Sequence, residues 1–116
     1  MSKERIQGMH LTPIGGAVVL LEPGDGLDPT DADAYLEPLA SYLQVQEARR
    51  LIYDLATVPV IDGVYYDWLK SVHAICAICG VEMVVAGMTP SAAYALAHTL
   101  NETPPFACAL NVDRAR

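Results

Sequence analysis

The chain has 116 residues, of which 53% are hydrophobic and 18% charged, and its formal net charge is -7. A chain of this length can bury a core as one domain, so we expect a single domain over residues 1–116. The acidic balance disfavours nucleic acid as a partner, because phosphate backbones are bound by clustered Lys and Arg. No apolar stretch reaches the ~20 residues of a membrane-spanning helix. We therefore expect a cytoplasmic protein with no direct membrane insertion.

The first predicted element is a pair of strands. Two short apolar segments, Ile6–Pro13 and Ala17–Glu22, are separated by a turn that contains Gly15 and Gly16. This arrangement is typical of a β-hairpin. The segment Pro23–Gly26 then breaks the second strand.

A helix is predicted next. Asp28 and Pro29 suit an N-cap and the first helical position, so we expect the helix to run from there to about Glu47. Pro38 lies inside this stretch and removes one backbone hydrogen bond. It predicts a kink or a restart near Leu36–Glu37.

Acidic residues cluster around the start of this helix. No Lys or Arg occurs between residues 6 and 48, whereas six acids fall within residues 22–37: Glu22, Asp25, Asp28, Asp31, Asp33 and Glu37. Their spacing is not that of a calcium-binding loop. The acids form either a solvated loop with first-turn carboxylates that the helix dipole favours, or a surface that attracts a basic partner. Both interpretations can hold together.

The rest of the chain alternates strands and helices. In chain order we expect a strand at Arg50–Leu55, a helix at Val64–Cys79 ended by Gly80, a strand at Val81–Ala86, a helix at Ser91–Leu100 opened by Pro90, a final strand at Phe106–Val112, and a charged tail at Asp113–Arg116. This order predicts an α/β fold in which about three to four helices cover a mixed, mostly parallel sheet.

Two blocks in the second half of the chain resemble the STAS domain, the fold of anti-sigma factor antagonists and of stressosome scaffold proteins. The first block is the strand, loop and helix start Leu51–Asp62 (LIYDLATVPVID), followed by Leu69 in the helix. The second is the strand and turn Gly80–Ala93 (GVEMVVAGMTPSAA). The upstream strand pair and helix fit the same layout, so the resemblance implies one STAS-like domain.

The resemblance implies a non-enzymatic switch without a cofactor. In such proteins a Ser or Thr directly after the loop Asp is phosphorylated by a serine kinase that is itself the binding partner, and the added charge of about -2 breaks the complex. Here Gly63 follows Asp62 and offers no acceptor. We favour a protein that binds without release by phosphorylation at this position. The alternative is that a neighbouring hydroxyl has taken over, from Thr57, Tyr65, Tyr66, Thr89 or Ser91.

The expected partner surface combines the loop and helix start Pro59–Trp68 with the turn Gly87–Ser91. Its candidate binding residues are Asp62, Gly63, Val64, Tyr65, Tyr66, Trp68, Thr89, Pro90 and Ser91. Asp before a helix is first of all an N-cap. The aromatic residues are of the types enriched in binding hot spots, but core packing explains them equally well. The helix is apolar nearly all round, which predicts a contact beyond its packing on the sheet.

The expected partners are a serine kinase of the anti-sigma factor type or other STAS proteins in a stressosome-like complex, and a homodimer through the apolar helix is an alternative. A second functional reading is a STAS accessory subunit that binds the ATPase of a membrane transporter. A third is a small thiol-redox or other enzyme that uses Cys76 and Cys79. These cysteines lie late in a helix, where the dipole does not stabilise a thiolate, so we expect buried, inert thiols. No metal site is expected.

Overall fold

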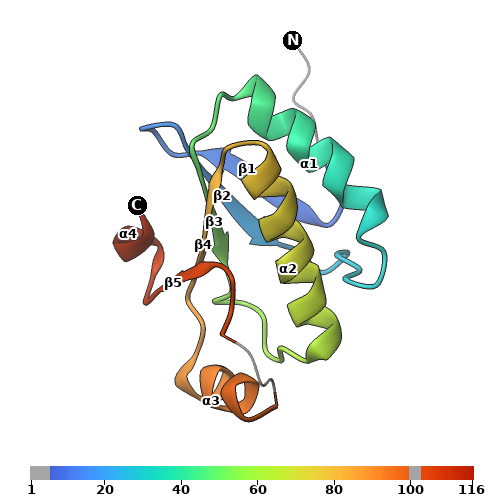
Figure 1. The fold of residues 1–116 in the computed structure, drawn as a ribbon, viewed down its shortest axis with the longest axis vertical. Helices are drawn as coiled ribbons and strands as arrows, with labels where there is room; N and C mark the ends of the chain where they lie inside the picture. Colours follow the sequence, from blue (N-terminus) through green and yellow to red (C-terminus); the bar gives the residue numbers. More distant parts are fainter. Residues whose placement is uncertain (1–5, 100–102) are drawn as a thin grey trace.

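A computed structural model describes residues 6–99 and 103–116 (Figure 1). The described residues form five strands and four helices in this order: β1 (Met9–Pro13), β2 (Val18–Pro23), α1 (Asp33–Val45), β3 (Arg50–Asp54), α2 (Gly63–Ile78), β4 (Glu82–Ala86), α3 (Pro90–Thr99), β5 (Ala107–Ala109) and α4 (Val112–Ala115). None of the helices within these ranges is long and apolar enough to cross a membrane.

The strands make one sheet in chain order, β1-β2-β3-β4-β5. β1 and β2 are antiparallel, with Met9 opposite Pro23, and the predicted hairpin is confirmed. The other neighbours, β2 with β3, β3 with β4 and β4 with β5, are parallel. The sheet is therefore mixed and mostly parallel, as the alternation of strands and helices predicted.

Helices α1 and α2 lie on one face of the sheet and enclose the main core (Figure 1). Leu51 and Tyr53 of β3 point to this face together with Val85 of β4, and all three are fully buried. Trp68 of α2 reaches across to Tyr35 of α1, with the ring centroids 5.4 Å apart. This aromatic contact helps to hold the two helices side by side over the sheet.

The short helix α4 lies on the opposite face, against alternate residues of the same strands. Ala115 packs there with Ile52, Val84 and Ala86, which are all buried. Here the sequence prediction was wrong, because the final strand ends at Ala109 and the supposed charged tail forms a helix.

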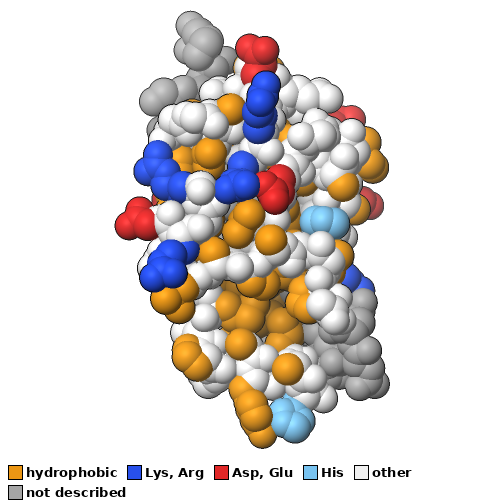
Figure 2. Space-filling view, turned by 60° about the vertical axis from the view of Figure 1, so that its left-hand side comes forward, with side chains coloured by type: hydrophobic (Ala, Val, Ile, Leu, Met, Phe, Trp, Pro, Cys, Tyr) orange, Lys and Arg blue, Asp and Glu red, His pale blue; other side chains and the backbone are white. Residues whose placement is uncertain are grey.

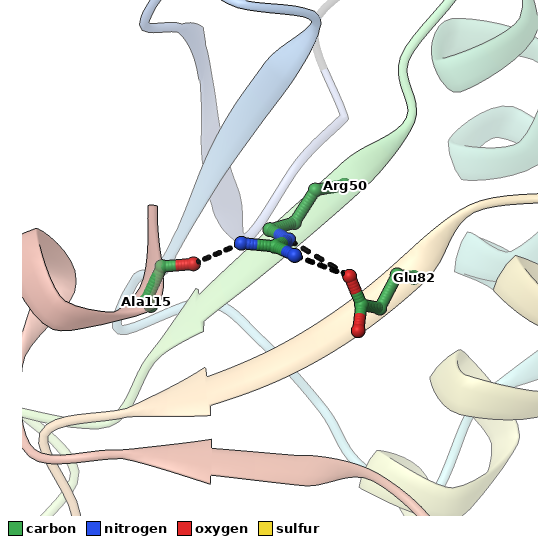
Figure 3. A network of polar contacts seen from close by, with 3 residues as sticks. All are labelled: Arg50, Glu82 and Ala115. Carbon is green, nitrogen blue, oxygen red and sulfur yellow. Dashed lines mark hydrogen bonds and ion pairs between the residues drawn. The ribbon is translucent and has the colours of Figure 1, made fainter.

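Arg50 of β3 links α4 to the sheet through hydrogen bonds (Figure 3). Its guanidinium donates to the Ala115 carbonyl at 2.8 Å and also pairs with the Glu82 carboxylate on the neighbouring strand. Arg116 adds a hydrogen bond to the carbonyl of Ile14 in the hairpin turn. Figure 2 looks towards this side of the molecule and shows the blue Lys and Arg side chains above a lower region rich in apolar side chains.

Helix α1 begins later than predicted, at Asp33 instead of Pro29. Asp28 caps a turn, where its carboxylate accepts from the backbone N–H and the hydroxyl of Thr30. Pro38 lies inside α1, which runs from Asp33 to Val45 without the expected restart. Helix α3 includes Pro90 at its start, and the predicted helix end at Leu100 falls outside the described residues.

Candidate functional site

The site begins at the N-terminus of α2, where the chain leaves the carboxyl end of β3. Asp62 has an extended backbone, and its carboxylate accepts from the backbone N–H of Tyr65 at 2.9 Å. It therefore fills the N-cap role that the sequence predicts. Gly63 is the first residue of the helix and is exposed, and a Cβ added there would meet no other atom within 4 Å. A side chain at position 63 would point into open solvent.

The aromatic residues of the first turns differ in their exposure. Tyr66 and Trp68 are each only 1% exposed and belong to the main core. They offer no contact area in this state, so we leave both out of the proposed partner surface. Val64 is 45% exposed and Tyr65 is half-buried.

Two of these aromatic side chains, Trp68 and Tyr65, form a hydrogen-bonded network with Tyr53 of β3 inside the domain. The indole N–H of Trp68 donates to Tyr53 Oη at 2.8 Å, and Tyr53 Oη lies 2.7 Å from Tyr65 Oη. Burial raises the pKa of Tyr53 far above its ordinary value, and burial also raises the pKa of Tyr65. Both phenols therefore stay neutral at physiological pH. The hydrogen-bonded network extends from the buried Trp68 to the half-buried ring of Tyr65.

The second predicted segment is the turn between β4 and α3. Thr89 is exposed, and its hydroxyl accepts from the backbone N–H of Ala92 at 3.2 Å, so it caps α3. Pro90 and Ser91, also exposed, open the helix, and Ser91 Oγ lies 3.4 Å from Thr89 Oγ1. Both hydroxyls stand at a helix start on the surface.

The loops after β3 and β4 are joined where they leave the sheet. The backbone N–H of Leu55 donates to the Ala86 carbonyl at 2.8 Å. Gly87 has a φ of +79°, and a Cβ there would come within 2.9 Å of Asp54 Oδ1 and 3.1 Å of the Ala56 nitrogen. The glycine thus permits a close approach that a side chain would prevent. The structure brings the two predicted segments to the same edge of the sheet, although α3 itself projects away from the sheet (Figure 1).

A pocket at this edge was not predicted from the sequence. It has a volume of about 290 Å³ and lies between the loop after β2, the loop after β3 and the first turn of α2. Asp25, Val58, Val60 and Tyr65 are among the residues that line it. No single motif marks such a pocket, because three separate segments form it.

Of the two cysteines considered for a redox pair, Cys76 is buried and Cys79 is half-buried. Cys76 is fully buried in the main core, and burial raises the pKa of its thiol to about 12, with Cys79 adding to the shift. A thiol of this kind stays protonated at neutral pH and is a poor nucleophile. Within residues 6–99 and 103–116, no group of His, Cys, Asp and Glu could hold a metal ion.

Comparisons with known proteins identify the fold. No family model matches the sequence, and no curated protein does so either. Among solved structures, a serine-to-glutamate variant of RsbS from Moorella thermoacetica matches with a TM-score of 0.75 and 17% identity, over 89% of each chain. A chain from a structure described as the molecular architecture of the stressosome, a signal integration and transduction hub, matches with a TM-score of 0.77 and 17% identity over 91% of each chain.

A third similar structure is that of the protein TM1081, determined by NMR, with a TM-score of 0.72 and 16% identity. It covers 99% of this chain and 94% of its own. The structural matches confirm that the chain has a STAS-domain fold. At these identities the likeness establishes the fold alone.

Proposed function

We propose that this protein is a non-enzymatic STAS-type regulator, similar to anti-sigma factor antagonists, that acts in the cytoplasm by binding other proteins. Its partner is a switch serine kinase of the anti-sigma factor type or another STAS protein in a stressosome-like complex. Through that partner it regulates transcription in a stress response. The likeness of its fold to RsbS and to a stressosome chain supports this proposal.

The proposed contact surface consists of Val60, the start of α2 at Asp62–Tyr65, and the turn Thr89–Ser91. Val60 and Val64 are 69% and 45% exposed, which is unusual for valine and leaves apolar area for a partner to cover. Asp62 and Thr89 cap their helices and so hold these segments in fixed positions.

The observation that carries the proposal is the environment of Gly63. It occupies the exposed first turn of α2, the position at which the STAS resemblance implies a phosphorylated Ser or Thr, and the space around it is empty. A phosphate there would lie near the N-terminus of α2, which favours an anion, but glycine cannot carry one. We therefore propose that binding at this surface is not ended by phosphorylation at position 63.

A capture experiment tests the proposal. The purified protein, immobilised and incubated with native lysate, is expected to recover a serine kinase of this type or STAS homologues, identified by mass spectrometry. Gly63→Glu is expected to reduce recovery at least tenfold, which corresponds to ~1.4 kcal/mol, because it places a charge in the contact surface. Gln44→Glu adds the same charge on the exposed side of α1 and is the matched control.

Three results would contradict the proposal. Recovery of a transporter ATPase in place of the kinase would favour the accessory-subunit reading. Equal recovery by Gly63→Glu and Gln44→Glu would show that the partner binds elsewhere. Phosphate mapped to Thr89 or Ser91 after incubation with the captured kinase and ATP would show that a neighbouring hydroxyl restores the switch.

A further inference from the structure

The pocket beside Tyr65 lies next to the proposed contact surface and shares Val60 with it. Its walls combine apolar side chains, among them Leu27, Val58 and Val60, with polar groups in similar measure, and they come from the loops after β2 and β3 and the first turn of α2. A volume of about 290 Å³ is just below the ~300–1,000 Å³ of pockets that hold drug-sized ligands. The pocket is therefore suited to one or two side chains of a partner.

The hydrogen bonds behind the pocket leave one donor available. Tyr53 Oη already accepts from the Trp68 indole, and its own proton is buried and needs an acceptor. Tyr65 Oη, at 2.7 Å, is the acceptor that the described residues provide. If Tyr53 donates to Tyr65, the proton of Tyr65 is directed away from the core. Tyr65 lines the pocket, so this proton is the donor that a ligand there could use, and a carbonyl oxygen is the group that suits it.

The charge at the pocket favours a cation. Asp25 lines the pocket and is exposed, and the sequence around it, from residue 6 to residue 48, contains no Lys or Arg. The acids at positions 22 and 28 lie close to it in the chain. A ligand group with a positive charge is attracted to the acidic residues around Asp25, whereas a ligand group with a negative charge is repelled.

We propose that this pocket binds a peptide segment of the partner in which an aliphatic side chain precedes a Lys or Arg. The aliphatic side chain packs against Leu27, Val58 and Val60, the basic group pairs with Asp25, and a main-chain carbonyl of the segment accepts from Tyr65. This inference rests on the proposed function, since it identifies what part of a partner the surface selects. It does not depend on which protein supplies the segment.

Peptide titration of the whole ¹⁵N-labelled protein tests the pocket without the partner. The probes are acetyl-Gly-Leu-Lys-Gly-amide and the same peptide with Glu in place of Lys, added to low-millimolar concentration. The Lys peptide is expected to shift the backbone amides of Gly24, Asp25, Val58, Val60 and Tyr65, and the Glu peptide is expected to bind at least fivefold more weakly. The preference for Lys is expected to fall with added salt.

Two variants and one control identify the groups involved. Asp25→Asn is expected to remove the preference for Lys over Glu, and Asp113→Asn, on α4 at the other face of the sheet, is expected to keep it. Tyr65→Phe is expected to weaken both peptides about equally, because it removes the donor and not the charge. The ¹⁵N spectrum of each variant reports whether the fold is retained.

The absence of shifts around the pocket with either peptide would overturn the inference, and so would equal binding of the two peptides. Such a result would leave the proposed function intact if capture still depends on position 63. Conversely, binding of the Lys peptide together with equal capture by Gly63→Glu and Gln44→Glu would support the pocket and contradict the proposed contact surface.

Discussion

Replacing Tyr53 by Phe removes the central oxygen of the hydrogen-bonded chain that links Trp68 to Tyr65. Tyr53 is fully buried and Trp68 is 1% exposed, so water cannot replace the lost acceptor of the indole N–H. A buried donor left without a partner costs ~1–3 kcal/mol. Tyr65 is half-buried and loses less, because water can reach its ring. We expect Tyr53→Phe to lower the free energy of unfolding by about 2 kcal/mol.

Urea unfolding measures this change, and Trp68, the single tryptophan of the chain, provides the fluorescence signal from within the network itself. With the usual dependence on urea for a domain of this size, about 2 kcal/mol lowers the midpoint by roughly 1 M. Tyr94→Phe is the matched control, since Tyr94 is 68% exposed. If the urea midpoints of Tyr53→Phe and Tyr94→Phe were equally close to that of the unmodified protein, the hydrogen bonds of Tyr53 would not contribute the expected free energy.

Three further changes test other parts of the structure. Burial raises the pKa of Tyr53 in the folded state, whereas the Tyr53 phenol of the unfolded chain ionises near pH 10. The free energy of unfolding, measured with urea, should therefore fall above pH 10 by up to ~1.4 kcal/mol per pH unit from this group. The fall should be less steep in Tyr53→Phe. Arg50→Ala should speed amide exchange of residues 112–115 about fivefold, unlike Arg49→Ala next to it. Gly87→Ala should destabilise by ~1–3 kcal/mol, since its φ is +79°, whereas Gly63→Ala should be neutral or stabilising by thermal unfolding.

Each of these expectations has a contrary result. An alkaline loss of stability that is unchanged in Tyr53→Phe would assign the effect to other groups. Equal exchange in the Arg50 and Arg49 variants would mean that packing alone holds α4. Tolerance of alanine at position 87 would show that the turn can relax away from the Asp54 carboxylate.

The sheet and α2 could be predicted because their signals are local. Leu51–Tyr53 is an uninterrupted apolar run, which is what a strand buried on both faces requires, and it lies in β3. Asp62 and Gly80 mark the two ends of α2 by their own side-chain and backbone preferences. These signals do not depend on what the rest of the chain does.

The start of α1 and the existence of α4 could not be read in this way. The backbone N–H of Asp28 donates to the hydroxyl of Tyr35, a contact across seven residues that accompanies a turn where the sequence predicted a helix. In α4 the Asn111 side chain accepts from the backbone N–H of Arg114, but a helix of four residues is too short to show a period. A contact with a side chain of α1 accompanies the first case, and contacts with the sheet hold α4 in the second.

The sequence placed the candidate site at the start of α2. It did not distinguish which side chains there are exposed. The cap at Asp62 and the glycine after it were visible in the sequence. The difference between buried Trp68 and half-buried Tyr65 was not, because an apolar pattern all round a helix does not tell which side faces the sheet. The pocket was missed because it requires the loops after two strands to meet.

The hydrogen bond from Arg50 to the Ala115 carbonyl joins residues 65 positions apart in the sequence, and the hydrogen bond from Arg116 to the Ile14 carbonyl joins residues 102 positions apart. A growing chain can pair β1 with β2 and cover the main core with α1 and α2 before α4 has left the ribosome. Until residues 112–115 emerge, the second face of the sheet keeps Ile52 and Val84 accessible. A nascent domain of this kind therefore exposes apolar side chains on that face until α4 packs against it, and such exposed surface is prone to aggregation.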